Sequence, residues 1–104
     1  MKPLKEAFLI KVPNVDRKDA QSSVILPHYE FYTILVEDYD MALDEGLKII
    51  EDKGIHGVIL CAGFSTTEFG DLAKAFGPDV GVFVASGDSR SNQVVSKAIE
   101  NAGW

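Results

Sequence analysis

Four runs of apolar residues, each followed by turn-forming or polar residues, predict four β-strands. The runs cover residues 7–12 (AFLIKV), 31–36 (FYTILV), 58–61 (VILC) and 80–85 (VGVFVA). They are apolar almost throughout instead of alternating, which is typical of strands that are covered on both faces in a parallel sheet. We therefore predict a four- to five-stranded, mainly parallel sheet.

Three further segments have apolar residues at spacings of three and four, the period of helices with one buried side. They span residues 40–53, 66–76 and 91–102, and Glu45 lies among the polar positions of the first. Residues suited to capping precede each segment, and glycine follows the first two. Strands that alternate with helices imply right-handed parallel crossovers. Residues 1–104 are thus expected to form one α/β domain, a small Rossmann- or flavodoxin-like three-layer sandwich.

Residues 15–30 fit this alternation least well. They allow a short helix over residues 16–21, followed by an extended piece over 23–26 that Pro27 ends. The apolar residues of that piece indicate that it covers an edge of the sheet or packs against another subunit. A chain this small can hardly bury the apolar segment 24–36 and Trp104 alone, so we predict a homo-oligomer, a dimer or larger.

The charge of the chain bears on its partners and location. With 16 acidic and 10 basic residues its net charge is −6. Attraction of Lys and Arg to phosphates supplies most non-specific affinity for nucleic acid, so neither nucleic acid nor an anionic membrane is an expected partner. The single cysteine cannot form an internal disulfide, and no signal-peptide pattern or membrane-length apolar stretch occurs. These features predict a cytoplasmic protein.

Open parallel sheets bind ligands beyond the carboxyl ends of their strands, where the strand order switches direction. Four loops would form that rim, at residues 13–16, 37–39, 62–67 and 86–90. If the four predicted strands, numbered along the chain, lie in the order 2-1-3-4, the first and third loops flank the switch. We therefore expect a small anion or carboxylate to bind between Asn14 and the third loop.

The third loop has the most suggestive chemistry. Gly63 allows a tight turn, and Phe64 is placed either to line a pocket or to pack against the next helix. Three hydroxyl residues then open the predicted helix, where backbone N–H groups attract anions: Ser65, Thr66 and Thr67. The competing interpretation is a capping box, Ser65-x-x-Glu68, which satisfies such N–H groups internally and repels phosphate. No glycine-rich nucleotide-binding motif occurs in the chain.

Arg90 is the one cation near the predicted rim, in the polar loop SGDSRSN. An arginine there is suited to pair with the carboxylate of a ligand. A solvated loop ahead of a capped helix explains the same residues.

Cys61 ends the third apolar run, at a strand end where a catalytic nucleophile or acid/base would stand. That role needs a nearby cation, helix start or base that favours the thiolate. Cysteine also packs in cores as a small hydrophobic residue, which fits the apolar run around it. His28 and His56 are the only histidines, and no His or Cys spacing typical of metal ligands occurs, so neither a metal nor another cofactor is expected.

The segments AFLIKVP, GVILCAGF and GVFVASGD are similar to those of a family of small uncharacterised single-domain α/β proteins with a strand-end Cys-Gly/Ala-Gly-Phe motif. The resemblance covers most of the chain outside residues 15–30, and it implies the fold without implying an activity. Cys61-Ala62-Gly63 also resembles the cysteine motif of aspartate/glutamate and hydantoin racemases. Those enzymes use two opposed cysteines, so one copy of this chain could not perform their reaction alone.

Three functions are open at this point. The preferred one is a small-molecule-binding module at the carboxyl rim of the sheet. The first alternative is an enzyme that uses Cys61 as nucleophile or acid/base on a small carboxylate. The second is a structural or regulatory homo-oligomeric subunit without a ligand.

Overall fold

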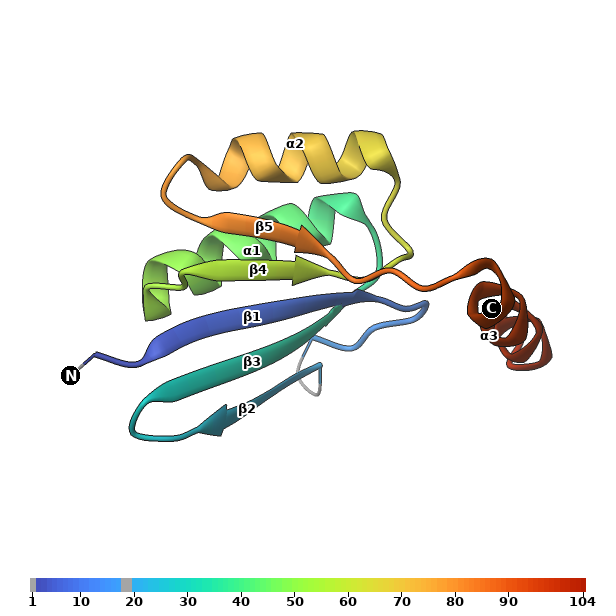
Figure 1. Ribbon diagram of the computed structural model, residues 1–104, viewed down its shortest axis with the longest axis horizontal. Coiled ribbons are helices and arrows are strands. Elements are labelled where there is room, and N and C mark those ends of the chain that lie inside the picture. The colour runs from blue at the N-terminus through green and yellow to red at the C-terminus, as the bar shows by residue number, and fades with distance from the viewer. Residues whose placement is uncertain (1, 18–19) are drawn as a thin grey trace.

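A computed structural model describes residues 2–17 and 20–104 (Figure 1). In chain order the elements are β1 (Leu4–Lys11), β2 (Gln21–Ile25), β3 (Tyr29–Val36), α1 (Tyr39–Lys53), β4 (Gly57–Leu60), α2 (Thr66–Phe76), β5 (Gly81–Val84) and α3 (Ser89–Asn101). The predicted α/β class, strands and helices are confirmed, with boundaries that shift by a few residues. None of the helices within the described residues is long and apolar enough to cross a membrane.

The five strands form one sheet in the order β2-β3-β1-β4-β5. β2 is antiparallel to β3, and all other neighbours are parallel. Since β3, β1, β4 and β5 are the second, first, third and fourth predicted strands, the order on which the rim prediction depended is confirmed. Residues 21–25 form an edge strand, as one alternative predicted. The short helix expected over residues 16–21 is not found in the described residues of that range, and residues 18–19 lie outside the described part.

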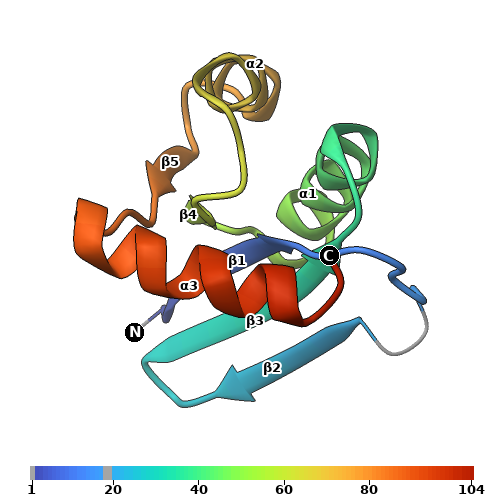
Figure 2. The ribbon, with the colours of Figure 1, turned by 90° about the vertical axis from the view of Figure 1, so that its right-hand side faces the viewer.

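α1 and α2 cover one face of this sheet (Figure 2). Asp38 caps α1 by accepting the Met41 N–H at 2.9 Å, and Gly54 ends the helix with a φ of 69°. The core lies between these two helices and the sheet, and its most buried large side chains are Leu9, Ile34, Val36, Val58, Leu60 and Leu72. Burial of these side chains fixes the ends of the central strands, from which the rim loops leave.

The structure differs from the predicted sandwich in its third layer, because the described residues place no helix on the second face of the sheet. α3 instead lies across the carboxyl ends of the strands (Figure 2), and none of its residues is buried. In a doubly wound fold a helix between β1 and β3 would cover that face. Here the connection runs through β2 at the sheet edge. α1 connects β3 to β4, and α2 connects β4 to β5, so both connections cross the sheet in the same direction. Right-handed crossovers that run in the same direction place their helices on the same face of the sheet.

Gly46 of α1 marks the closest approach between the two helices that cover the sheet. A Cβ at this position would collide with the ring of Phe76 in α2, whose Cε1 lies 2.7 Å away. Because Phe76 is itself buried in the core, its ring has little room to move. We expect Gly46→Ala to lower the free energy of unfolding by about 1–3 kcal/mol, as overpacking usually does. Urea denaturation measures the change.

Gly70→Ala in α2 is the matched control, since a Cβ there meets nothing within 4 Å. Alanine is favoured over glycine inside a helix, so this variant should gain up to about 1 kcal/mol. Losses of equal size in the two variants would contradict the role given to the contact between Gly46 and Phe76.

Candidate functional site

The carboxyl ends of β1 and β4 lie side by side where the connections of the sheet change direction. The chain leaving β1 turns toward β2 and β3, whereas the chain leaving β4 passes through α2 to β5. Leu9 pairs with Leu60, and the Cys61 N–H donates to the Leu9 carbonyl at 3.2 Å. The loops after the two strands therefore flank one crevice, the kind of place where open α/β sheets bind ligands.

Lys11, the last residue of β1, lies in the middle of this crevice. Its amide N–H donates to the sulfur of Cys61 at 3.2 Å, and its ammonium lies 3.4 Å from both carboxylate oxygens of Glu68. The ammonium is also 5.4 Å from the centre of the Phe64 ring, within range of cation–π attraction. Lys11 was not among the predicted site residues, although a single cation at the end of an apolar strand was a signal for it.

The start of α2 forms a capping box. Ser65 Oγ accepts the Glu68 N–H at 3.1 Å, and the Glu68 carboxylate accepts the Ser65 N–H at 2.9 Å. The hydrogen bond from the Ser65 amide is the main cause that lowers the pKa of Glu68; partial burial opposes it, and the Lys11 ammonium lowers the pKa further. Of the three hydroxyl residues expected at an anion, Ser65 is thus engaged within the helix start, while Thr66 and Thr67 are exposed.

α3 closes the outer side of the crevice and leaves a cavity of about 390 Å³, which we call the rim cavity. Its walls come from the end of β1 and the loop after it, the loop after β3, the loop after β4, and the end of the chain. The lining residues are Lys11, Val12, Pro13, Glu37, Gly63, Ile99 and Trp104. Apolar residues make up most of the wall, and Lys11 and Glu37 are its two charged residues. The Lys11 ammonium contacts Glu68 and Phe64, which are not among the lining residues.

The predicted site residues differ in how close they lie to this cavity. Gly63 lines it. Asn14, with a φ of 56°, turns the loop after β1 and donates its N–H to Glu37 at 2.9 Å, so it holds a residue of the cavity wall. Phe64 is buried in the core. Arg90 is exposed in the first turn of α3 and is not among the lining residues.

Cys61 is partly buried and packs against the core. Both histidines lie at the other end of the sheet. His56 Nδ1 accepts the Lys5 N–H at 3.0 Å, and the His28 carbonyl accepts the Leu4 N–H at 3.1 Å. Neither is placed to serve Cys61 as a base. Within the described ranges, no group of three or more His, Cys, Asp and Glu residues could hold a metal ion.

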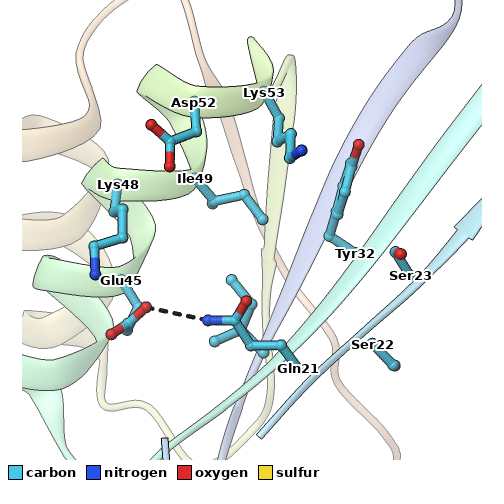
Figure 3. Close-up of a pocket in the computed structure, with 10 residues that line it drawn as sticks. Gln21, Ser22, Ser23, Tyr32, Glu45, Lys48, Ile49, Asp52 and Lys53 are labelled. Atoms are coloured by element: carbon cyan, nitrogen blue, oxygen red, sulfur yellow. Dashed lines mark hydrogen bonds between the residues drawn. The ribbon is translucent and has the colours of Figure 1, made fainter. Parts of the chain in front are cut away.

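A second hollow, of about 260 Å³, lies between α1 and the edge formed by β2 and β3 (Figure 3). Glu45 of α1, predicted at a polar position, is only 4% exposed beside it. Its carboxylate accepts hydrogen bonds from Arg17 at 2.9 Å and from Gln21 at 3.3 Å, which allows the charge to be buried. No buried side-chain nitrogen or oxygen in the described residues lacks a partner, so the burial of Glu45 beside the groove leaves no unmet polar atom in the core.

Residues 4–100 match the model of a family of unknown function, DUF6506. The chain belongs to this family. The match includes every strand and nearly all of α3, so the lining residues of the rim cavity other than Trp104 fall within the DUF6506 region. Neither a curated protein nor a solved structure matches the chain. The expected resemblance to an uncharacterised α/β family is confirmed at that level, and the likeness of residues 61–63 to racemases gains no support.

The paired carboxylate of Glu68 predicts a pH-dependent contribution to stability. We expect Glu68→Gln to lower the free energy of unfolding near neutral pH by about 1 kcal/mol, because an amide is a weaker acceptor than a carboxylate and does not pair with Lys11. In the wild type this contribution is complete above the ordinary pKa of the carboxyl and is lost as pH falls through the lowered pKa of the folded chain.

The difference between Glu68→Gln and wild type should therefore shrink below about pH 4 in a series of urea denaturations. Glu51→Gln, at an exposed position of α1, is the control and should change stability by less than about 0.5 kcal/mol. A difference for Glu68→Gln that persists unchanged in acid would show that its charge is not involved.

Partial burial of Cys61 predicts slow chemistry at its sulfur. We expect iodoacetamide to label the folded protein at least about ten-fold more slowly than the urea-unfolded chain, because the reagent must wait for local opening. Mass spectrometry follows the reaction, and Cys61→Ala gives the background. Labelling of the folded protein as fast as that of the unfolded chain would instead favour an accessible, activated thiolate.

Proposed function

We propose that the protein is a small-molecule-binding module that holds a compact, largely apolar carboxylate in the rim cavity. The position of the cavity is the observation that carries this proposal. It lies between the loops after β1 and β4, where the two connections leave in opposite directions and open a crevice without loss of strand pairing. Its volume of about 390 Å³ falls in the usual range of small-molecule sites.

The wall of the cavity favours a ligand with an apolar body. Val12, Pro13, Ile99 and Trp104 all line it, so the loop after β1 and the end of the chain supply its apolar surface. Trp104 is 56% exposed and therefore has much apolar area left to lose. Each CH₂ group that a ligand buries there contributes about 0.8 kcal/mol.

Lys11 supplies the counter-charge for a carboxylate. Its contact with Glu68 is long, at 3.4 Å, and about a quarter of each side chain is exposed (27% and 25%). Pairs of this kind contribute about 0–1 kcal/mol, so a ligand can share the Lys11 ammonium at little cost. An ammonium has three N–H donors and can serve both carboxylates at once. Glu37, the acidic residue of the wall, has one oxygen engaged by the Asn14 N–H.

An enzyme that uses Cys61 has less support. The sulfur accepts a hydrogen bond from the Lys11 amide, and Cys61 is not among the residues that line the rim cavity. Both histidines are at the other end of the sheet, so neither supplies the base that such a mechanism requires.

Thermal unfolding with matched pairs of probes tests the proposal. The probes are butyrate, hexanoate, benzoate and phenylacetate, each compared with its primary amide. A ligand at 100 times its Kd adds about 2.7 kcal/mol, which for a chain of this size raises Tm by roughly 10 °C or more. We expect at least one carboxylate to raise Tm and its amide to do so less, and we expect Lys11→Met to weaken binding by about ten-fold or more.

Lys74→Met, in the last turn of α2, is the control that removes a charge away from the cavity and should bind as wild type does. Equal binding of acids and amides would contradict the role of Lys11 while leaving the cavity as a site. A Tm that no probe changes would contradict the proposed function itself.

A further inference from the structure

The uncovered face of the sheet is mostly apolar, with Ser22, Tyr29 and Thr33 as its uncharged polar residues. In each strand the side chains that alternate with the buried ones point to this face. Its apolar residues are Leu4, Phe8, Ile10, Val24, Phe31, Leu35, Ile59 and Phe83. Gly57 and Gly81 leave room for the Phe83 ring to lie against the strands, since a Cβ at either would come within 3.5 Å of it. Parallel strands are normally buried on both faces, so this surface lacks its partner.

Charge is nearly absent from the same face. Among the described strand residues that point to it, Glu6 alone is charged, and its carboxylate accepts the Tyr29 hydroxyl at 2.9 Å. The chain as a whole has a net charge of −6, so two copies repel each other wherever their acidic surfaces meet. The uncovered face is therefore a surface on which a second copy can pack with little electrostatic cost.

We propose that this face packs against the same face of a second copy, in a dimer with two-fold symmetry. Two-fold contacts require a self-complementary surface, and a broad apolar face with one internally bonded carboxylate meets that requirement. The chain's own α3 does not cover the face, because its Ile99 and the following Trp104 lie at the rim cavity. The dimer leaves that cavity in place, and the proposal does not rest on the proposed function.

The face supplies much of the area that a stable dimer needs. Leu4, Val24 and Phe83 are 50%, 60% and 56% exposed, and the other five apolar residues of the face are partly buried. At about 100 Å² for each half-exposed side chain and about 50 Å² for each partly buried one, the face offers roughly 550 Å² from each copy, against about 800 Å² per partner in a typical stable interface. The first turns of α3 extend past the sheet on its uncovered side, where they can add to this area (Figure 2).

Light scattering on the purified chain, at micromolar concentrations and at several salt concentrations, gives the first test. We expect twice the chain mass of 11.3 kDa. Phe83→Glu and Val24→Glu should each weaken the dimer by at least about 100-fold, because each buries two unpaired carboxylates in an apolar contact. Leu47→Glu introduces the same change at a 43% exposed position of α1, on the other side of the molecule, and should remain dimeric. Circular dichroism confirms that each variant is folded.

Cross-linking identifies what lies on the face. In a Cys61→Ser background, Ile59→Cys places one thiol near the middle of the face, and a short bismaleimide should join two copies through it. Leu47→Cys in the same background should give no covalent dimer. Three outcomes would overturn the proposal. The first is a wild-type protein that stays monomeric. The second is a dimer that Leu47→Glu disrupts as strongly as Phe83→Glu does, and the third is a dimer that cross-links through residue 47 and not through residue 59. The last two outcomes would assign the interface to another surface or to α3.

Discussion

Parallel hydrogen bonding of β1 to both β3 and β4 is the interaction on which the rest of the structure depends. It pairs Lys11 with Val36 on one side and Leu9 with Leu60 on the other. The ends of three strands therefore meet at one level, and the loops that follow them supply one side of the rim cavity, which α3 and the end of the chain complete. The same pairing makes β1 the central strand, with a core on one side and the uncovered apolar face on the other.

Much of this architecture could be predicted from local patterns. Apolar runs locate the strands, and apolar residues spaced three and four apart locate the helices. The pattern Ser65-x-x-Glu68 predicts the capping box that the structure contains. Each of these features depends on residues that are neighbours in the chain. The strand order was a condition of the rim prediction and not a result of these patterns, because right-handed connections leave several orders open.

The remaining features depend on contacts between residues that are far apart in the chain. A periodic pattern within one segment does not indicate such contacts. Glu45 looks like a surface residue in its helix and is buried because Arg17 and Gln21 reach it from the other side of a groove. Lys11 looks like the end of a strand and gains its importance from Cys61 and Glu68, some fifty residues later. The apolar side of α3 predicted burial on the sheet, yet where a terminal helix docks is decided by tertiary contacts that its own sequence does not specify.

β2 has a consequence for how the chain folds. It joins β3 through three residues, Leu26 to His28, and the Leu26 N–H donates to the Tyr29 carbonyl at 2.8 Å. This hairpin closes a very short loop, whereas the pairing of Glu6 with Gly57 brings together residues half a chain apart. Short closures form in microseconds and distant pairings limit the folding rate. We therefore expect the β2–β3 hairpin to form before β1 pairs with it, and the pairing of β4 with β1 to be the slow step of folding.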